Sequence, residues 1–209
     1  DHDVLVLHGA EPDHNWRAFV AAVIGLADRF GVRRVVGLGA YPAAVPHTRP
    51  SRLTITSPTV ELARSNVPGA TLDVPAGIQA ALEIGLDGAG LETRTLWAQV
   101  PHYLPVAPYP AATLALVEGL RETVGIRADP GDLAEEALAT RNRLDRLVAE
   151  DPANQEMLGE LERQHDAMTH DGTSLPTSDE LADEIEQFLR NQDDDEPHPE
   201  PGDPGEDAT

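Results

Sequence analysis

The sequence has no cysteine, few aromatic residues and far fewer basic than acidic side chains. Only 4% of its 209 residues are aromatic, and 15 basic side chains stand against 37 acidic ones. Without cysteine there are no disulfides, no thiol catalysis and no cysteine-ligated metal. A formal net charge of −22 argues against nucleic acid or an anionic membrane surface as a partner. No apolar run is long enough to cross a bilayer, and the chain does not open with a signal peptide. We therefore expect a cytoplasmic protein.

The first 126 residues alternate between strand and helix patterns. A hydrophobic fraction of 40% is enough for a core. Short apolar runs bounded by turn residues are typical of buried strands, and apolar residues at helical spacing are typical of amphipathic helices. The predicted strands cover residues 3–8, 33–38, 53–56 and 93–98, and the predicted helices cover residues 13–30, 59–64, 77–85 and 111–124. This order predicts an α/β domain over residues 1–126 with a mainly parallel sheet and right-handed crossovers.

The remaining chain has no strand pattern. Two amphipathic helices are predicted on either side of the break at Asp151-Pro152, and this short break favours an antiparallel hairpin. A capping box at Thr177 and Glu180 begins a third helix. Residues 127–191 therefore form a predicted helical extension, whose apolar faces either cover the sheet or meet other subunits. Residues 192–209 hold eight acidic residues and no basic ones, a composition that predicts disorder.

Polar and aromatic side chains gather in the loops that follow three predicted strands. Ligands of open parallel sheets bind beyond the carboxyl ends of the strands. The last of these loops lies in residues 96–116, where four prolines make the chain stiff. We therefore expect the three loops to meet at one rim of the sheet. The candidate rim site consists of His8, Glu11, His47, Arg49, Trp97, His102 and Tyr103.

These rim residues allow several chemistries. Imidazole and carboxylate side chains can bind zinc or iron, or can act as general acid and base. However, no pair has the close helical spacing of a typical metal motif, so we expect neither a metal nor a cofactor. Arg49 can clamp an anion or pair with Glu11 or another carboxylate. We favour a structural role, in which His47 and His102 fix the loops through backbone or carboxylate partners. In that role, His102→Ala costs about 1–3 kcal/mol of stability.

Four segments together resemble the PAC2 family, the proteasome assembly chaperone 2 group, in its actinobacterial branch. They read HGAEPDHNW, GAYPAAVPHTRP, WAQVPHYLPVAPYPAATLAL and, near the end, LPTSDELADEIEQFLR. The resemblance implies a three-layer α/β/α sandwich similar to nucleoside phosphorylases, and a homo-oligomer, because bacterial members include trimers. Family domains normally begin with strands that precede the segment at residues 3–8, so we expect residues upstream of Asp1.

Two departures from the family pattern bear on function. The family often has Gly-Pro-Thr-Gly before the middle helix, where this chain reads Val74-Pro75-Ala76-Gly77 and lacks the hydroxyl. Relatives that engage proteasome subunits can end in a hydrophobic-Tyr-X tail, whereas this chain ends Asp207-Ala208-Thr209. The first departure weakens an anion cradle at the helix start, and the second weakens direct proteasome docking.

Two functions remain open from the sequence. The first is a non-enzymatic, homo-oligomeric interaction or assembly-chaperone-like factor that also contacts other proteins. The second is a hydrolase or transferase that acts on a small substrate at the rim. The sequence contains no Gly-x-Gly-x-x-Gly, P-loop or Gly-x-Ser-x-Gly motif, so an ATP-dependent ligase has no support. We favour the first function.

Overall fold

The computed structural model of the chain describes residues 3–59, 64–65, 77–104 and 107–170. Residues 1–168 form one compact unit and residues 169–209 form a second. Of the second unit, the structure describes only residues 169–170, at the end of the last helix. Ala76, the predicted third helix of the extension, the acidic tail and most of the predicted helix over 59–64 lie outside the described residues. The fold and the site below concern the first unit.

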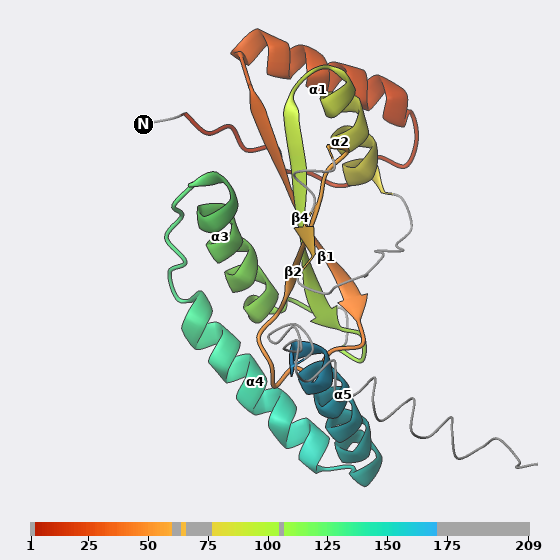
Figure 1. Cartoon of the computed structure of the whole chain (residues 1–209), viewed down its shortest axis with the longest axis vertical. Helices are drawn as coiled ribbons and strands as arrows, with labels where there is room; N and C mark the ends of the chain where they lie inside the picture. The colour runs from red at the N-terminus through yellow and green to blue at the C-terminus, as the bar shows by residue number, and fades with distance from the viewer. Residues whose placement is uncertain (1–2, 60–63, 66–76, 105–106, 171–209) are drawn as a thin grey trace, which may run out of the picture. The chain divides into compact units, whose positions relative to one another are not determined.

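Helices and strands follow one another much as the periodicity predicts (Figure 1). The sheet carries two long strands, whereas the sequence predicted shorter ones at these positions. The elements are α1 (Trp16–Phe30), β1 (Arg34–Ala43), β2 (Leu53–Thr56), β3 (Arg64–Ser65), α2 (Ile78–Gly88), β4 (Glu92–Pro101), α3 (Pro110–Val124), α4 (Leu133–Ala149) and α5 (Pro152–His170). None of these helices is long and apolar enough to cross a membrane.

The sheet has the strand order β1-β4-β2-β3 and is mixed rather than mainly parallel. β1 runs parallel to β4, from the pair Arg34 and Glu92 to the pair Ala43 and Pro101. β2 is antiparallel to both β4 and β3. The prediction of a mainly parallel sheet is therefore wrong for the described strands. Parallel strands need a long crossover connection, and the nine residues between β1 and β2 contain no helix, so β2 returns in the opposite direction.

The predicted first strand, over residues 3–8, does not form. Residues 3–8 have no regular structure, and the apolar side chains of residues 4–7 are 57% to 85% exposed. A strand is stable only where a neighbour pairs with its peptide groups. No described strand pairs with this segment, so its apolar pattern alone does not make it a strand.

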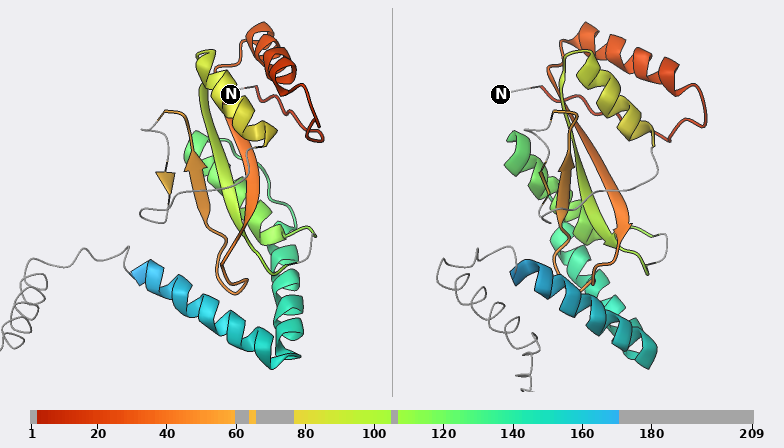
Figure 2. Two further views of the ribbon diagram at one scale, coloured as in Figure 1. Left: turned by 90° about the vertical axis from the view of Figure 1, so that its right-hand side faces the viewer. Right: turned by 45° about the vertical axis from the view of Figure 1, so that its right-hand side comes forward.

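Neighbouring residues of β4 face opposite sides of the sheet and meet different helices. Leu96 is fully buried and lies against α3, where a Cβ atom on Gly119 would come within 2.8 Å of the Leu96 side chain. Thr95, also buried, faces the other side, next to Gly37 and the α2 side chain of Gln79. α3 therefore lies on one face of the sheet, while α2 lies on the opposite face with α1 packed on it (Figures 1 and 2).

The C-terminal helices do not form the predicted antiparallel hairpin. α4 packs against α3 and buries Leu144. Pro152 is the first residue of α5, as predicted, and Asp151 accepts a hydrogen bond from the Ala153 amide at 2.9 Å. From this break α5 turns away from α4 (Figure 2). α4 packs along α3 and not along α5, so the hairpin prediction is wrong.

Candidate functional site

His47 is the most buried of the predicted rim residues. It lies in the loop after β1, and only 3% of the residue is exposed. Its backbone amide donates to the hydroxyl oxygen of Tyr103 at 2.8 Å, and its Nδ1 atom lies 2.7 Å from the same hydroxyl. Its Nε2 atom lies 3.1 Å from Oδ1 of Asp145 on α4. His47 thus joins the loop after β1, the loop after β4 and α4.

The partners of His47 select one tautomer of its neutral imidazole. An ionised carboxylate can only accept a hydrogen bond, so Nε2 carries a proton and donates to Asp145. In the neutral ring Nδ1 is unprotonated and accepts from the Tyr103 hydroxyl, whose oxygen in turn accepts from the His47 amide. Burial raises the pKa of Tyr103 to about 12, so its hydroxyl keeps the proton that it donates. Every polar atom of the His47 ring is therefore engaged.

Arg49, two residues further on, pairs with α5. Its Nε and Nη2 atoms donate to the two carboxylate oxygens of Asp166 at 2.9 and 2.7 Å, and Nη1 donates to Glu162 at 3.2 Å. The hydroxyl of Thr48 also donates to Glu162. The hydrogen bonds from Arg49 lower the pKa of Asp166 to about 2, and the same pairing raises the pKa of Arg49. Arg49 therefore pairs with carboxylates, which was one of the predicted alternatives. Its partners are Asp166 and Glu162 and not Glu11.

His102 and Tyr103 secure the ends of the two long strands. The backbone amide of His102 donates to the Ala43 carbonyl at 3.0 Å, and its Nδ1 atom lies 3.2 Å from the same oxygen. The rings of His102 and Tyr103 meet edge to face, with centroids 5.6 Å apart. His102 is exposed, unlike His47. The structure thus brings His47, Arg49, His102 and Tyr103 together at the carboxyl ends of β1 and β4.

The other three predicted rim residues lie elsewhere. Glu11 accepts a hydrogen bond from the amide of Ile78 at 2.6 Å, at the start of α2. His8 is exposed in the irregular segment before α1. Trp97 lies within β4, donates to the hydroxyl of Thr56 at 3.0 Å and packs across Gly39. The described contacts of Glu11 and Trp97 do not include any of the four residues that meet at the strand ends.

The helical partners of this cluster were not predicted. Asp145 on α4 and Glu162, His165 and Asp166 on α5 all lie in stretches that the sequence marked only as amphipathic helices. The spacing of Glu162 and Asp166, four residues apart, places both on one side of a helix and could have indicated a shared cationic partner. His165, whose side chain is 9% exposed, has a pKa lowered mainly by burial.

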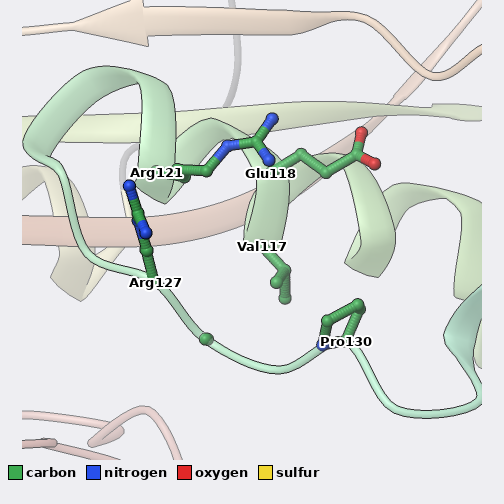
Figure 3. A pocket seen from close by; sticks show the side chains of 6 residues that line it. Val117, Glu118, Arg121, Arg127 and Pro130 are labelled. Carbon is green, nitrogen blue, oxygen red and sulfur yellow. The ribbon is translucent and has the colours of Figure 1, made fainter.

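Two further observations concern possible ligand sites in the described part of the chain. No group of three or more His, Asp or Glu side chains in the described part of the chain is arranged to hold a metal ion. A surface hollow lies beside α3 and the chain that follows it (Figure 3), but it contains none of the predicted rim residues. It is lined by Val117, Glu118, Arg121, Arg127, Ala128 and Pro130. Its two arginines are exposed, and Arg121 is 3.9 Å from Glu122.

The fold and this cluster define an α/β protein in which two C-terminal helices bind the carboxyl end of its own sheet. Residues 1–148 match the model of the PAC2 family, which is most of the chain. The protein therefore belongs to the PAC2 family.

Three solved structures of actinobacterial proteins are similar to this chain. A PAC2 family protein from Streptomyces avermitilis is 35% identical, with a TM-score of 0.64 over 72% of this chain and 63% of that one. A Mycobacterium tuberculosis protein of unknown function is 33% identical, with a TM-score of 0.68 over 88% and 56%. A proteasome-assembly chaperone homologue from Mycobacterium tuberculosis is 32% identical, with a TM-score of 0.65 over 73% and 64%. The chain thus spans less than two thirds of the length of these relatives. No curated protein matches it significantly.

Proposed function

We propose that this PAC2 protein is a non-enzymatic factor that acts through protein contacts, as a homo-oligomer and as an assembly-chaperone-like partner of other proteins. One observation carries the proposal. The two rim groups best suited to chemistry, His47 and Arg49, are already bonded to partners within the chain. A general base must reach a proton of its substrate, and His47 has both ring nitrogens engaged and is buried. Arg49 likewise donates hydrogen bonds from three of its nitrogen atoms to carboxylates of α5.

The similarity to a proteasome-assembly chaperone homologue from Mycobacterium tuberculosis supports the same class of function. We further propose that the fold has the three-layer, phosphorylase-like arrangement that the family resemblance implies, and that the homo-oligomer is a trimer. The helices α4 and α5 offer a contact surface, because Leu138, Leu147 and Met168 are 51% to 59% exposed on them. Exposed apolar side chains of this size favour protein contacts when they lie together.

Two measurements test the proposal. Light scattering at micromolar concentrations should give the mass of a homo-oligomer, and a monomer mass throughout would contradict assembly. Co-elution with actinobacterial proteasome α subunits tests for the chaperone-like partner. In both assays Leu147→Glu on α4 should weaken association, whereas Leu26→Glu on α1, at a residue of similar exposure, should not. Equal effects of both substitutions would show that Leu147 of α4 does not belong to the contact surface.

A hydrolase or transferase function is the alternative, and no observation among the described residues favours it. A thermal-shift screen with phosphorylated compounds and nucleosides addresses it directly. We expect no compound to raise the melting temperature reproducibly. A compound that does so for the wild type, but not for His102→Ala, would place a ligand at the strand ends and would favour the enzymatic function.

A further inference from the structure

The segment of residues 46–49 contacts α4 and α5 separately, each through its own side chains. His47 bonds with Asp145 of α4, while Thr48 and Arg49 bond with Glu162 and Asp166 of α5. We infer that the hydrogen bonds and ion pairs between this loop and α5 set the position of α5 independently of α4. We call the residues that form them the clasp: Thr48, Arg49, Glu162 and Asp166.

α4 and α5 are attached to the rest of the protein in different ways. α4 packs along α3, and Leu144 is buried on it. α5 turns away from α4 after Asp151 and has its own buried contact at Leu161, which is 6% exposed. Its first five residues are exposed, and so are residues 167–168. The turns that carry Leu161, the clasp carboxylates and the side chain of His165, which is 9% exposed, are therefore the part of α5 that holds it in place.

The two attachments also differ in their access to water. The side chain of His47 is fully buried, so its bond with Asp145 is shielded from salt on one side. In the clasp, the side chains of Arg49, Glu162 and Asp166 are 32%, 31% and 45% exposed. Exposed ion pairs weaken as the Debye length falls from about 10 Å at 0.1 M salt to about 3 Å at 1 M. Burial lowers the pKa of His165 on the same stretch of α5, and the charge of Arg52 lowers it further.

It follows that α5 moves as an arm when the clasp is weakened, while α3, α4 and the sheet keep their arrangement. The break at Asp151 and Pro152 is the pivot, because no continuous helix ties α5 to α4 there. The loop that carries Thr48 and Arg49 should stay in place when α5 moves, because His47 in the same loop still bonds with Asp145 and Tyr103.

The absence of cysteine allows a direct measurement of the arm's position. Ala139→Cys on α4 and Ala167→Cys on α5, both at exposed residues outside the proposed contact surface, accept nitroxide labels whose separation can be measured by pulsed electron resonance. The labelled chain is mixed with an excess of unlabelled chain, so that only distances within one subunit are measured in a homo-oligomer. At 0.1 M NaCl we expect one narrow distance distribution for the labelled chain. Adding Arg49→Gln should broaden or shift it. The matched control is Arg163→Gln, which removes the same charge from an exposed pair with Glu160 on α5 but leaves the clasp intact.

Hydrogen exchange on unlabelled chains separates release of the arm from loss of the fold. With Arg49→Gln, amides of residues 158–168 should exchange at least about tenfold faster, and those of α3 and α4 should change less than about twofold. Asp166→Asn should reproduce this pattern. If Arg49→Gln does not fold, the labelled wild-type chain in 1 M NaCl gives the same test, because its distribution should broaden there.

Three results would overturn the inference. The first is an unchanged distribution with Arg49→Gln, or an unchanged distribution of the labelled wild-type chain in 1 M NaCl. The second is equal acceleration of exchange in α3, α4 and α5, which would show that Arg49 supports the whole fold. The third is an equal effect of Arg163→Gln, which would show that losing any positive charge near α5, and not the clasp in particular, changes the position of the helix.

Discussion

His47 donates its Nε2 proton to Asp145 over 3.1 Å, although 98 residues separate the two in the sequence. The histidine side chain is fully buried and the carboxylate is 44% exposed. The bond therefore lies at the boundary between the sheet and the helical extension, with its donor inside the protein. It ties α4 to the loop after β1 and leaves the Nδ1 atom of His47 for Tyr103.

Tyr103→Phe should lower the free energy of unfolding by about 2 kcal/mol, because the His47 amide and Nδ1 atom would both lose their partner. Urea denaturation of the two chains gives this difference. His102→Ala is the control. Since His102 is exposed, its loss should cost less than about 1 kcal/mol, a smaller effect than the sequence alone suggested. A larger loss for His102→Ala than for Tyr103→Phe would contradict this ranking.

Asp166 should make stability depend on acid pH. Its pKa is lowered to about 2 by Arg49, below the unfolded value of about 4. A lowered carboxyl pKa contributes stability that is present above the unfolded pKa and is lost as the pH falls through the folded pKa. Asp166→Asn should therefore be less stable than the wild type at pH 6, and the difference should shrink between pH 4 and pH 2.

The measurement is the urea midpoint of both chains at pH 6, 4 and 3. Glu118→Gln, on α3 and outside the clasp, shows how much of any change comes from removing one negative charge. A difference between wild type and Asp166→Asn that stays constant over this range would show that the ion pair with Arg49 does not carry the effect.

Two glycine-to-alanine substitutions in helices should have opposite effects. A Cβ atom on Gly119 would meet Leu53 and Leu96 in the core, so Gly119→Ala should destabilise the protein by about 1–3 kcal/mol. A Cβ atom on Gly25, inside α1, meets nothing within 4 Å, so Gly25→Ala should stabilise by about 0.5–1 kcal/mol. Thermal or urea unfolding distinguishes the two signs. Stabilisation by both would mean that α3 can move off the sheet at little cost.

Deletion of residues 192–209 should leave the melting temperature within about a degree of the intact chain, because an acidic segment without an apolar face has little to bury. Differential scanning calorimetry of the full and shortened chains measures this. Light scattering of the shortened chain should give the same oligomer mass. A drop of several degrees, or a change in mass, would show that the segment binds to the rest of the protein.

Local patterns in the sequence were enough to place most elements. Helical periodicity and the glycine at position 31, which ends α1 with φ at 65°, predicted α1, and the Asp151-Pro152 break predicted where α5 begins. β2 was predicted with its observed bounds. Periodicity, caps and breakers act within a few residues, so they can be read without knowing the rest of the structure. The motifs that resemble the PAC2 family were also visible at this level.

The tertiary structure decided the direction of the strands and the partners of the charges. An apolar run at residues 4–7 reads as a strand, yet strand formation depends on a neighbour that only the folded chain can supply. The sequence analysis placed Arg49 at the rim, but its partner Asp166 lies 117 residues further along the chain, on α5. The sequence likewise predicted the same loop-fixing role for His47 and His102. In the structure His47 is buried and His102 is exposed, because different segments pack over the two loops. Pairing and burial depend on distances between segments, which a local pattern does not contain.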